Sequence, residues 1–182
     1  MDAVRYAGIG SRSTPEDVLK IMKQLAIVFA NYGFILRSGG ADGADSAFEK
    51  GCDLAKGEKE IYLPWKGFNG NNSELYTQCD KAYEIAFQFH PNLFGTSEGV
   101  QKLMARNTYQ VLGKNCRTKS NFIVCYCEED AKGDWKGGTG QALRIAKNKK
   151  IPIFNLYHKE QLEELKNFAK QLTDDFGPFK DC

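Results

Sequence analysis

The sequence predicts an α/β protein in which helices cover both faces of a mostly parallel sheet. Three observations lead to this prediction. Short apolar runs typical of strands alternate with longer runs whose apolar residues recur at helical spacing. The chain has 182 residues, which suits a single domain over residues 1–182, and its 42% apolar content is typical of a globular fold. Strands joined through helices favour right-handed crossovers and therefore a Rossmann-like three-layer domain.

Each expected strand is a short apolar run closed by glycine, proline or a polar turn. In chain order these runs are residues 4–10, 34–40, 59–65, 121–127 and 151–157. A polar loop, Lys66–Thr77, follows the third run. Cys125 and Cys127 lie two residues apart in the fourth, so they are expected to point the same way.

Each expected helix carries an apolar stripe at a spacing of three or four residues. In chain order these helices are residues 14–33, 44–55, 78–89, 97–112, 141–150 and 159–172. Thr14 is expected to cap the first helix and Gly33 to end it, and Asp42 is a candidate cap for the second. The tail, residues 173–182, is expected to be loosely held.

Three loops rich in glycine or small polar residues follow the first, second and fourth strands. They are Gly8–Thr14, Ser38–Asp45 and Glu128–Gly140. In open α/β sheets ligands bind beyond the carboxyl ends of the strands, and glycine lets backbone N–H groups approach an anion. The loops therefore predict a phosphate-bearing ligand, with tight turns as the plain alternative. The candidate binding residues on them are Gly8, Gly10, Ser11, Arg12, Ser38, Gly39, Gly40, Ala41, Gly43, Asp45, Gly137, Gly138 and Thr139.

Some of these residues have a second interpretation. Asp45 is expected either to contact a sugar hydroxyl or to hold local structure. Trp65, Phe68 and Trp135 lie in or beside the loops, where packing is favoured over stacking on a base. Arg106 and Asn107 lie in an otherwise core-like helix, and the plain interpretation is a solvent-facing side.

Several function classes are disfavoured. The sequence has neither a dinucleotide-binding G-x-G-x-x-G with its acidic partner nor a Walker G-K-[ST]. The six cysteines form no C-x-x-C pair, so no metal and no cofactor are expected, and reduced, semi-buried thiols are predicted. A net charge of +2 gives little support for a nucleic-acid surface. No signal sequence or long apolar run is recognised, so we expect a cytoplasmic protein without membrane contact.

Four segments together resemble the SLOG superfamily. They are "YAGIGSR" (6–12), "LRSGGADGADSAFEKG" (36–51), "LMARNTYQ" (103–110) and "GGTGQALRIAKNKKIPIFNL" (137–156). This superfamily joins the Rossmann domain of DNA-processing protein A, the Lonely Guy hydrolases and nucleotide-sensing domains of bacterial antiviral systems. The resemblance implies a nucleotide-derived ligand over the strand ends, with phosphates on the "SGG" and "GGTG" segments. It also adds Arg106 and Asn107 to the candidate site.

The chain departs from the hydrolase pattern of that superfamily. Arg144 stands where the hydrolases have their catalytic glutamate, and no proline precedes Gly137. The resemblance therefore favours binding over hydrolysis and assigns no catalytic residue. Because Arg144 lies one turn beyond the glycines, it is expected to face solvent.

The resemblance implies a small single-domain protein of bacterial or phage type, located in a bacterial cell or phage-infected host. It also implies that the protein recognises or sequesters a nucleotide signal, such as a cyclic nucleotide or an ADP-ribose derivative, in a phage anti-defence setting. The alternatives are a nucleotide N-glycosidic hydrolase and a single-stranded DNA binder, although a nucleic-acid partner is not expected. A homo-oligomer is expected, paired through Gln101–Leu112 as an exposed apolar helix.

Overall fold

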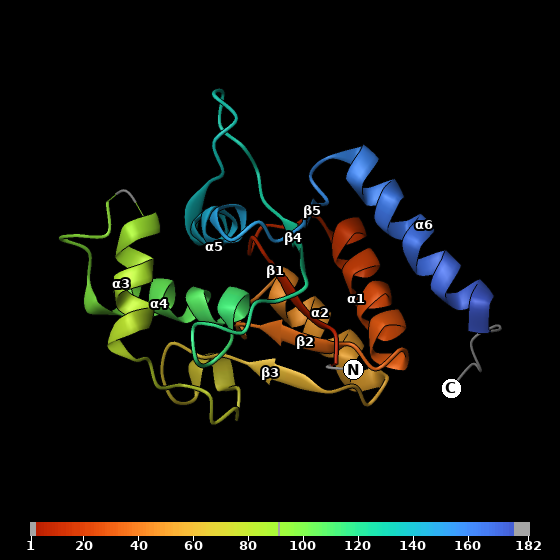
Figure 1. Cartoon of the computed structure of the whole chain (residues 1–182), viewed down its shortest axis with the longest axis horizontal. Coiled ribbons are helices and arrows are strands. Elements are labelled where there is room, and N and C mark those ends of the chain that lie inside the picture. Colours follow the sequence, from red (N-terminus) through yellow and green to blue (C-terminus); the bar gives the residue numbers. More distant parts are fainter. Residues whose placement is uncertain (1–2, 91, 177–182) are drawn as a thin grey trace.

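The computed structural model describes residues 3–90 and 92–176 as one α/β domain (Figure 1). Its strands are β1 (Arg5–Gly10), β2 (Ile35–Ser38), β3 (Lys59–Ile61), β4 (Phe122–Tyr126) and β5 (Ile153–Asn155). Its helices are α1 (Glu16–Asn31), α2 (Ala44–Leu54), the short 3₁₀ turn η1 (Phe68–Gly70), α3 (Asp80–Phe89), α4 (Glu98–Leu112), α5 (Gly137–Asn148) and α6 (Lys159–Phe176). The predicted order of strands and helices is confirmed.

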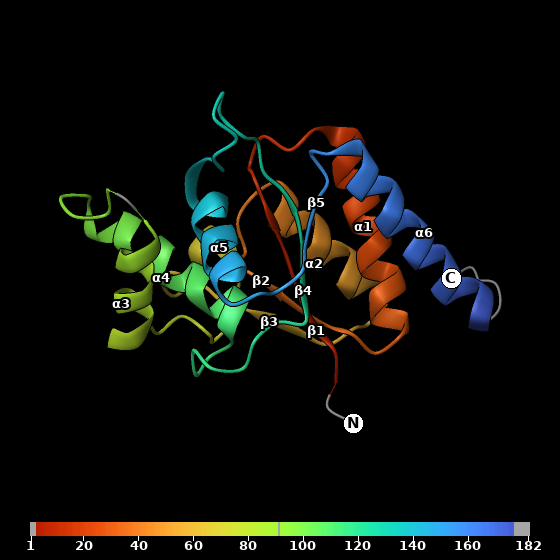
Figure 2. The ribbon, with the colours of Figure 1, turned by 45° about the horizontal axis from the view of Figure 1, so that its top comes forward.

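The described strands form one parallel sheet in the order β3-β2-β1-β4-β5. Helices α1, α2 and α6 lie on one face, and α4 and α5 lie on the other with α3 outside α4 (Figures 1 and 2). The chain leaves β1 toward β2 on one side and returns to β4 on the other side. This reversal of direction between β1 and β4 opens a crevice at their carboxyl ends.

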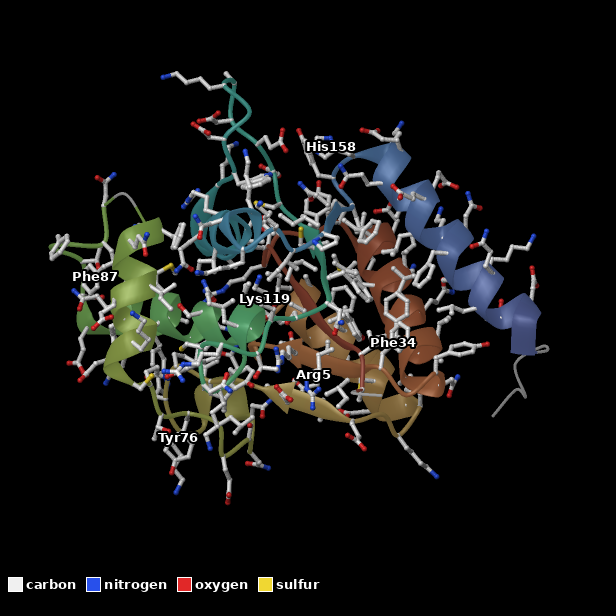
Figure 3. All side chains as sticks on the ribbon, viewed as in Figure 1. Arg5, Phe34, Tyr76, Phe87, Lys119 and His158 are labelled. Carbon is white, nitrogen blue, oxygen red and sulfur yellow. The ribbon has the colours of Figure 1, made fainter. Side chains whose placement is uncertain are left out.

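Two apolar cores hold the three layers together, because neighbouring strand residues point to opposite faces. On β1, Tyr6 packs toward α1 and α2, whereas Ala7 packs toward α4 and α5. The predicted stripe of α2 is confirmed, because Ala44, Ala47, Phe48 and Cys52 are all buried. Figure 3 shows the side chains, with Phe34 beside the aromatic cluster of the first core.

The helix starts differ from their predictions. Thr14 does not cap α1, because its hydroxyl donates to the Ser11 carbonyl at 2.7 Å and the cap position is Pro15. Asp42 does not cap α2 either, since Gly43 occupies the cap position and no side chain caps it. In both helices, therefore, no capping side chain accepts a hydrogen bond from the N–H groups of the first turn.

The helix expected to pair two copies is buried inside this one. Residues Ala105–Leu112 of α4 are all buried under α3 and α5 and against the sheet. The expectation of an exposed apolar surface at Gln101–Leu112 is therefore wrong. The apolar residues of this helix form part of the second core.

The segment after β5 is tied to the loop after β4. Glu129 in that loop hydrogen bonds His158, which lies just before α6, at 2.9 Å. The expected loose tail is helical as far as Phe176, and the rest of it lies outside the described residues. Within residues 3–90 and 92–176, no helix is both long and apolar enough to cross a membrane.

Candidate ligand-binding site

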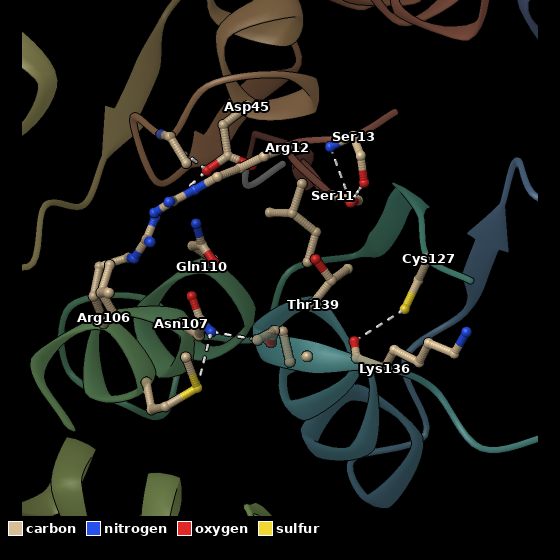
Figure 4. Close-up of a pocket in the computed structure, with 18 of the residues that line it drawn as sticks. Ser11, Arg12, Ser13, Asp45, Arg106, Asn107, Gln110, Cys127, Lys136 and Thr139 are labelled. Carbon is tan, nitrogen blue, oxygen red and sulfur yellow. Dashed lines mark hydrogen bonds and ion pairs between the residues drawn. The ribbon is translucent and has the colours of Figure 1, made fainter. Parts of the chain in front are cut away.

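A cleft of about 480 Å³ lies at the carboxyl ends of β1 and β4, where the strand order reverses (Figure 4). Its walls are the loop after β1, the start of α2, the middle of α4 and the first turn of α5. Of the predicted binding residues, the cleft brings together Gly10, Ser11, Arg12, Ala41, Asp45, Arg106, Asn107, Gly137, Gly138 and Thr139. Gly8, Ser38, Gly39, Gly40 and Gly43 lie behind this lining.

The β1 wall is a tight loop fastened to β4. The Ser11 N–H donates to the Tyr126 carbonyl at 3.0 Å, and the hydroxyls of Ser11 and Ser13 are 2.9 Å apart. Gly10 leaves room for α2, because a β-carbon there would lie 2.7 Å from that of Ala44. The side chain of Arg12 is exposed at the edge of this wall. The loop thus presents a cation and two hydroxyls to the cleft.

The loop after β2 holds an internal carboxylate where a phosphate was predicted. Asp45 Oδ2 accepts the N–H groups of Gly39, at 3.1 Å, and Ala41, at 3.3 Å. Asp45 is 3% exposed, and positive φ angles at Gly40 and Gly43 let the loop wrap around it. These contacts agree with the interpretation that Asp45 holds local structure; the other interpretation was contact with a sugar hydroxyl.

The glycines behind the lining have packing roles. Ser38 Oγ donates to the Gly8 carbonyl at 2.6 Å, which joins β2 to β1. A β-carbon at Gly8 would meet the ring of Phe48, and one at Gly39 would overlap the guanidinium of Arg106. These glycines therefore let the sheet, α2 and Arg106 come close together.

Arg106 is the innermost cation of the site. It is 5% exposed, so the plain interpretation of a solvent-facing residue is wrong. Its Nη1 donates to the Gly39 carbonyl at 2.6 Å and lies 3.4 Å from Asp45 Oδ2. Its Nε is buried, and no group of the described chain hydrogen bonds it. The guanidinium lies 5.8 Å from the ring centre of Phe68, which packs below it.

Polar residues of α4 hold the first turn of α5. Asn107 Nδ2 donates to the Gly138 carbonyl at 3.0 Å and to Gln141 Oε1 at 3.1 Å. In the amide orientation that satisfies its neighbours, the side-chain oxygen of Gln110 accepts hydrogen bonds from Gly39 N at 2.9 Å and from Arg106 Nη1 at 3.2 Å. Sequence reasoning missed Gln110, although it lies on the Arg106 face of α4 at i+4.

The "GGTG" segment forms the start of a helix. Gly137, Gly138 and Thr139 lie in the first turn of α5, whose cap position is Lys136 and which no side chain caps. The first N–H groups of a helix lack partners within it and carry partial positive charge. This uncapped turn lies opposite Arg106 across the cleft (Figure 4).

Burial sets the electrostatics of the inner cleft. Burial raises the pKa of Asp45 to about 6, which outweighs the opposing effects of Arg106 and the backbone N–H groups. Burial also lowers the pKa of Arg106, with Asp45 opposing this shift and the nearby Arg12 adding to it. Asp45 pairs with Arg106 alone of the two arginines, and the lining has more cationic side chains (Arg12, Arg106 and Lys136) than carboxylates (Asp45 and Glu128).

Cys127, Glu128 and Lys136 also line the cleft, and the sequence analysis did not include them among the candidate site residues. Glu128 and Lys136 lie in the predicted loop Glu128–Gly140 and Cys127 ends the predicted fourth strand, so their place beside this loop was the available signal. Glu128 forms an ion pair with Lys136 at 3.7 Å. Asp45 and Glu128 are the two carboxylates among the described residues that line this cleft.

Arg144 and the aromatic residues lie outside the lining. Arg144 does not face solvent as expected, because its Nε donates to the Phe89 carbonyl at 2.9 Å and its Nη1 to that of Trp135 at 3.1 Å. Trp65 packs edge-on against Phe68. Within the described chain, no cluster of three His, Cys, Asp or Glu side chains has the arrangement of a metal site.

The fold has counterparts among solved structures. DNA processing protein A from Helicobacter pylori matches with a TM-score of 0.55 and 17% identity, over 96% of this chain and 82% of that one. The same protein from Streptococcus pneumoniae matches with a TM-score of 0.52 and 11% identity, over 97% of this chain and 58% of that one. The chain has the fold of DNA processing protein A.

The likeness to DNA processing protein A fits the SLOG resemblance drawn from the sequence motifs. This chain spans less than two thirds of the Streptococcus pneumoniae structure. A molybdenum cofactor carrier protein from Chlamydomonas reinhardtii also aligns, with a TM-score of 0.47 and 18% identity over 84% of this chain and 75% of that one. No protein-family model and no curated protein sequence matches the chain.

Proposed function

We propose that the cleft binds a small nucleotide-derived ligand and holds its phosphate between Arg106, Arg12 and the first turn of α5. One observation carries this proposal: a buried guanidinium with an unpaired Nε faces an uncapped helix N-terminus across an open cleft. A charge that is buried without full compensation is costly. An anion in the cleft would compensate the Arg106 charge and meet the positive end of the helix.

The size and lining of the cleft favour a ligand of mononucleotide size. Its volume of about 480 Å³ lies in the usual range for small-molecule sites. The Ser11 and Ser13 hydroxyls and the Glu128 carboxylate lie on the outer walls, where they suit sugar hydroxyls. Nucleoside monophosphates, cyclic nucleotides and ADP-ribose derivatives share this chemistry.

We propose that the protein binds its ligand and does not convert it to a product. Arg144, which replaces the hydrolase glutamate, is held by two backbone carbonyls outside the cleft. Asp45 is bound to two N–H groups and to Arg106, and these contacts hold the loop after β2. The protein then recognises or sequesters a signalling nucleotide in the cytoplasm, and we place it among phage anti-defence proteins.

Native mass spectrometry of protein purified from cells tests the proposal first, because a tight ligand would remain bound. Calorimetric titration with AMP, ADP-ribose and a cyclic dinucleotide follows. We expect micromolar or tighter binding of at least one of them, weakened at least tenfold in Arg106→Gln. Arg117→Ala, which removes an exposed arginine of the loop before β4, is the control. Failure of all three probes to bind, with no co-purified ligand, contradicts the proposal.

Single-stranded DNA binding is the second candidate. DNA processing protein A from Helicobacter pylori binds single-stranded DNA, and the present chain shares its fold. Fluorescence anisotropy with labelled oligothymidines of increasing length separates the two candidates. A mononucleotide site gives an affinity independent of length, whereas a DNA groove gives an affinity that rises with length and falls steeply with salt.

The hydrolase alternative has its own test. Chromatography of nucleoside monophosphates and NAD incubated with the protein detects any released base. We expect release far below an enzyme's typical rate of about 1 per second or above. If release is fast and Glu128→Gln abolishes it, Glu128 is the catalytic carboxylate and the binding proposal is wrong.

A further inference from the structure

Cys79 is an exposed thiol at the start of a helix, far from the cleft lining. It occupies the cap position of α3, and its backbone N–H donates to the Tyr109 hydroxyl at 2.6 Å. Its sulfur also faces the N–H groups of Lys81 and Ala82 in the first turn. The other cysteines of the described chain are buried, so Cys79 departs from the predicted semi-buried thiols.

A second thiol lies against the first. Helices α3 and α4 lie side by side in both ribbon views, and Cys116 follows α4 in a turn (Figures 1 and 2). Its N–H donates to the Gly113 carbonyl at 2.9 Å, and its φ of 56° is that of a left-handed turn residue. The Cys116 side chain is buried and interacts directly with the Cys79 sulfur.

The surroundings distinguish the two thiols. The Tyr109 hydroxyl most strongly lowers the pKa of Cys79, and the Cys116 thiol and the helix N–H groups act in the same direction. Burial raises the pKa of Cys116 to about 12, with the adjacent Cys79 adding to the shift. The Lys81 ammonium lies near Cys116. The exposed thiol is thus the better nucleophile, and the buried one is placed behind it.

We propose that Cys79 and Cys116 are a redox-active pair that a hydroperoxide oxidises to an intramolecular disulfide. The Cys79 thiolate attacks one oxygen of hydrogen peroxide and breaks the O–O bond. A sulfenic acid forms on Cys79, and the other oxygen leaves as water after taking up the thiol proton. The Cys116 sulfur then attacks the Cys79 sulfur and releases a second water. Two thiols and one peroxide become one disulfide and two waters.

The pair is independent of the proposed ligand. It involves the α3 start and the turn after α4, whereas Arg106 and Asn107 lie on the part of α4 that faces the cleft. Tyr109, one turn along α4 from Arg106, is a positioning residue that binds the Cys79 backbone and orients its sulfur.

The test uses the full chain carrying Cys182→Ser, which removes the terminal thiol, treated with stoichiometric hydrogen peroxide. Alkylation of the remaining thiols and peptide mapping should show the loss of two thiols and one Cys79–Cys116 linked peptide. In Cys116→Ser, a dimedone adduct should accumulate on Cys79. In Cys79→Ser, the alkylation of Cys116 should be unchanged by peroxide.

Two results would overturn the proposal. One is Cys79 reacting with peroxide no faster than buried Cys125, and the other is Cys79 linked to a cysteine other than Cys116. Tyr109→Phe tests the positioning role. In this variant the rate of Cys79 alkylation, followed against pH, should rise at a higher pH than in the parent, by a measurable fraction of a pH unit. Circular dichroism shows whether each variant is folded, and an unshifted profile in a folded variant contradicts that role.

Discussion

The Asp45 carboxylate accepts the backbone N–H groups of Gly39 and Ala41 and lies 3.4 Å from the Arg106 guanidinium. The glycine-rich loop after β2 therefore binds an anion that belongs to the chain itself. In doing so it holds Arg106 at the inner end of the cleft. In the proposed site, Arg106 contacts the phosphate from this inner end, together with Arg12 and the first turn of α5.

Removing the outer cation should weaken ligand binding. We expect Arg12→Ala to lose about 10- to 100-fold in affinity for AMP, because a charge-assisted hydrogen bond contributes roughly 1.5–3 kcal/mol and Arg12 is partly screened by solvent. Calorimetry at fixed ionic strength measures this loss, and Arg117→Ala should bind like the parent. Equal affinities of Arg12→Ala and the parent would place the phosphate away from β1.

Asp45 should make stability depend on pH in an unusual direction. Its folded pKa of about 6 lies above the ordinary value of 3.8, so the folded state binds the proton more tightly. The Asp45 contribution is therefore present below about pH 4 and is lost as the pH rises through about 6. Relative to Asp45→Asn, the parent should gain about 2 kcal/mol of unfolding free energy between pH 7 and pH 4.

Urea unfolding of the parent and Asp45→Asn at several pH values measures this difference. Asp42→Asn is the matched control, because it changes an exposed carboxylate of the same loop. A difference between the parent and Asp45→Asn that stays constant over this range would show that Asp45 remains ionised beside Arg106.

A β-carbon at Gly39 should displace Arg106. It would overlap the Arg106 guanidinium and the Gln110 amide, so Gly39→Ala should cost about 1–3 kcal/mol of stability and most of the affinity for AMP. Gly99→Ala in α4 is the control, since its nearest neighbour would lie 3.9 Å away. Thermal unfolding and calorimetry should show the control unchanged or slightly more stable. Full affinity in Gly39→Ala would exclude Arg106 as a ligand contact.

Arg144 should matter for stability and not for binding. Arg144→Ala breaks hydrogen bonds to the carbonyls of Phe89 and Trp135, which should cost about 1–3 kcal/mol. Its affinity for AMP should stay within about twofold of the parent. Denaturant unfolding and calorimetry, with Arg117→Ala as the arginine control, measure both effects. A strong loss of affinity at unchanged stability would move the ligand toward the outer side of α5.

Local patterns predicted the elements well, because each depends on residues close in the chain. The apolar stripe of α2, the glycine that ends α1 and the alternation of strands with helices all follow from spacing. The loops at the carboxyl ends of β1 and β4 were predicted for the same reason, since a parallel sheet fixes which ends meet.

The sequence by itself determined the fold class, the order of elements and the edge of the sheet on which the cleft opens. The tertiary structure decided which polar groups at that edge are available to a ligand. Arg106 and Asp45 are 61 positions apart, and their pairing depends on how α4 packs against the loop after β2. The burial of α4, the anchoring of Arg144 and the Cys79–Cys116 contact likewise join distant segments. No local pattern encodes such contacts, because they exist only when the two helical layers close on the sheet.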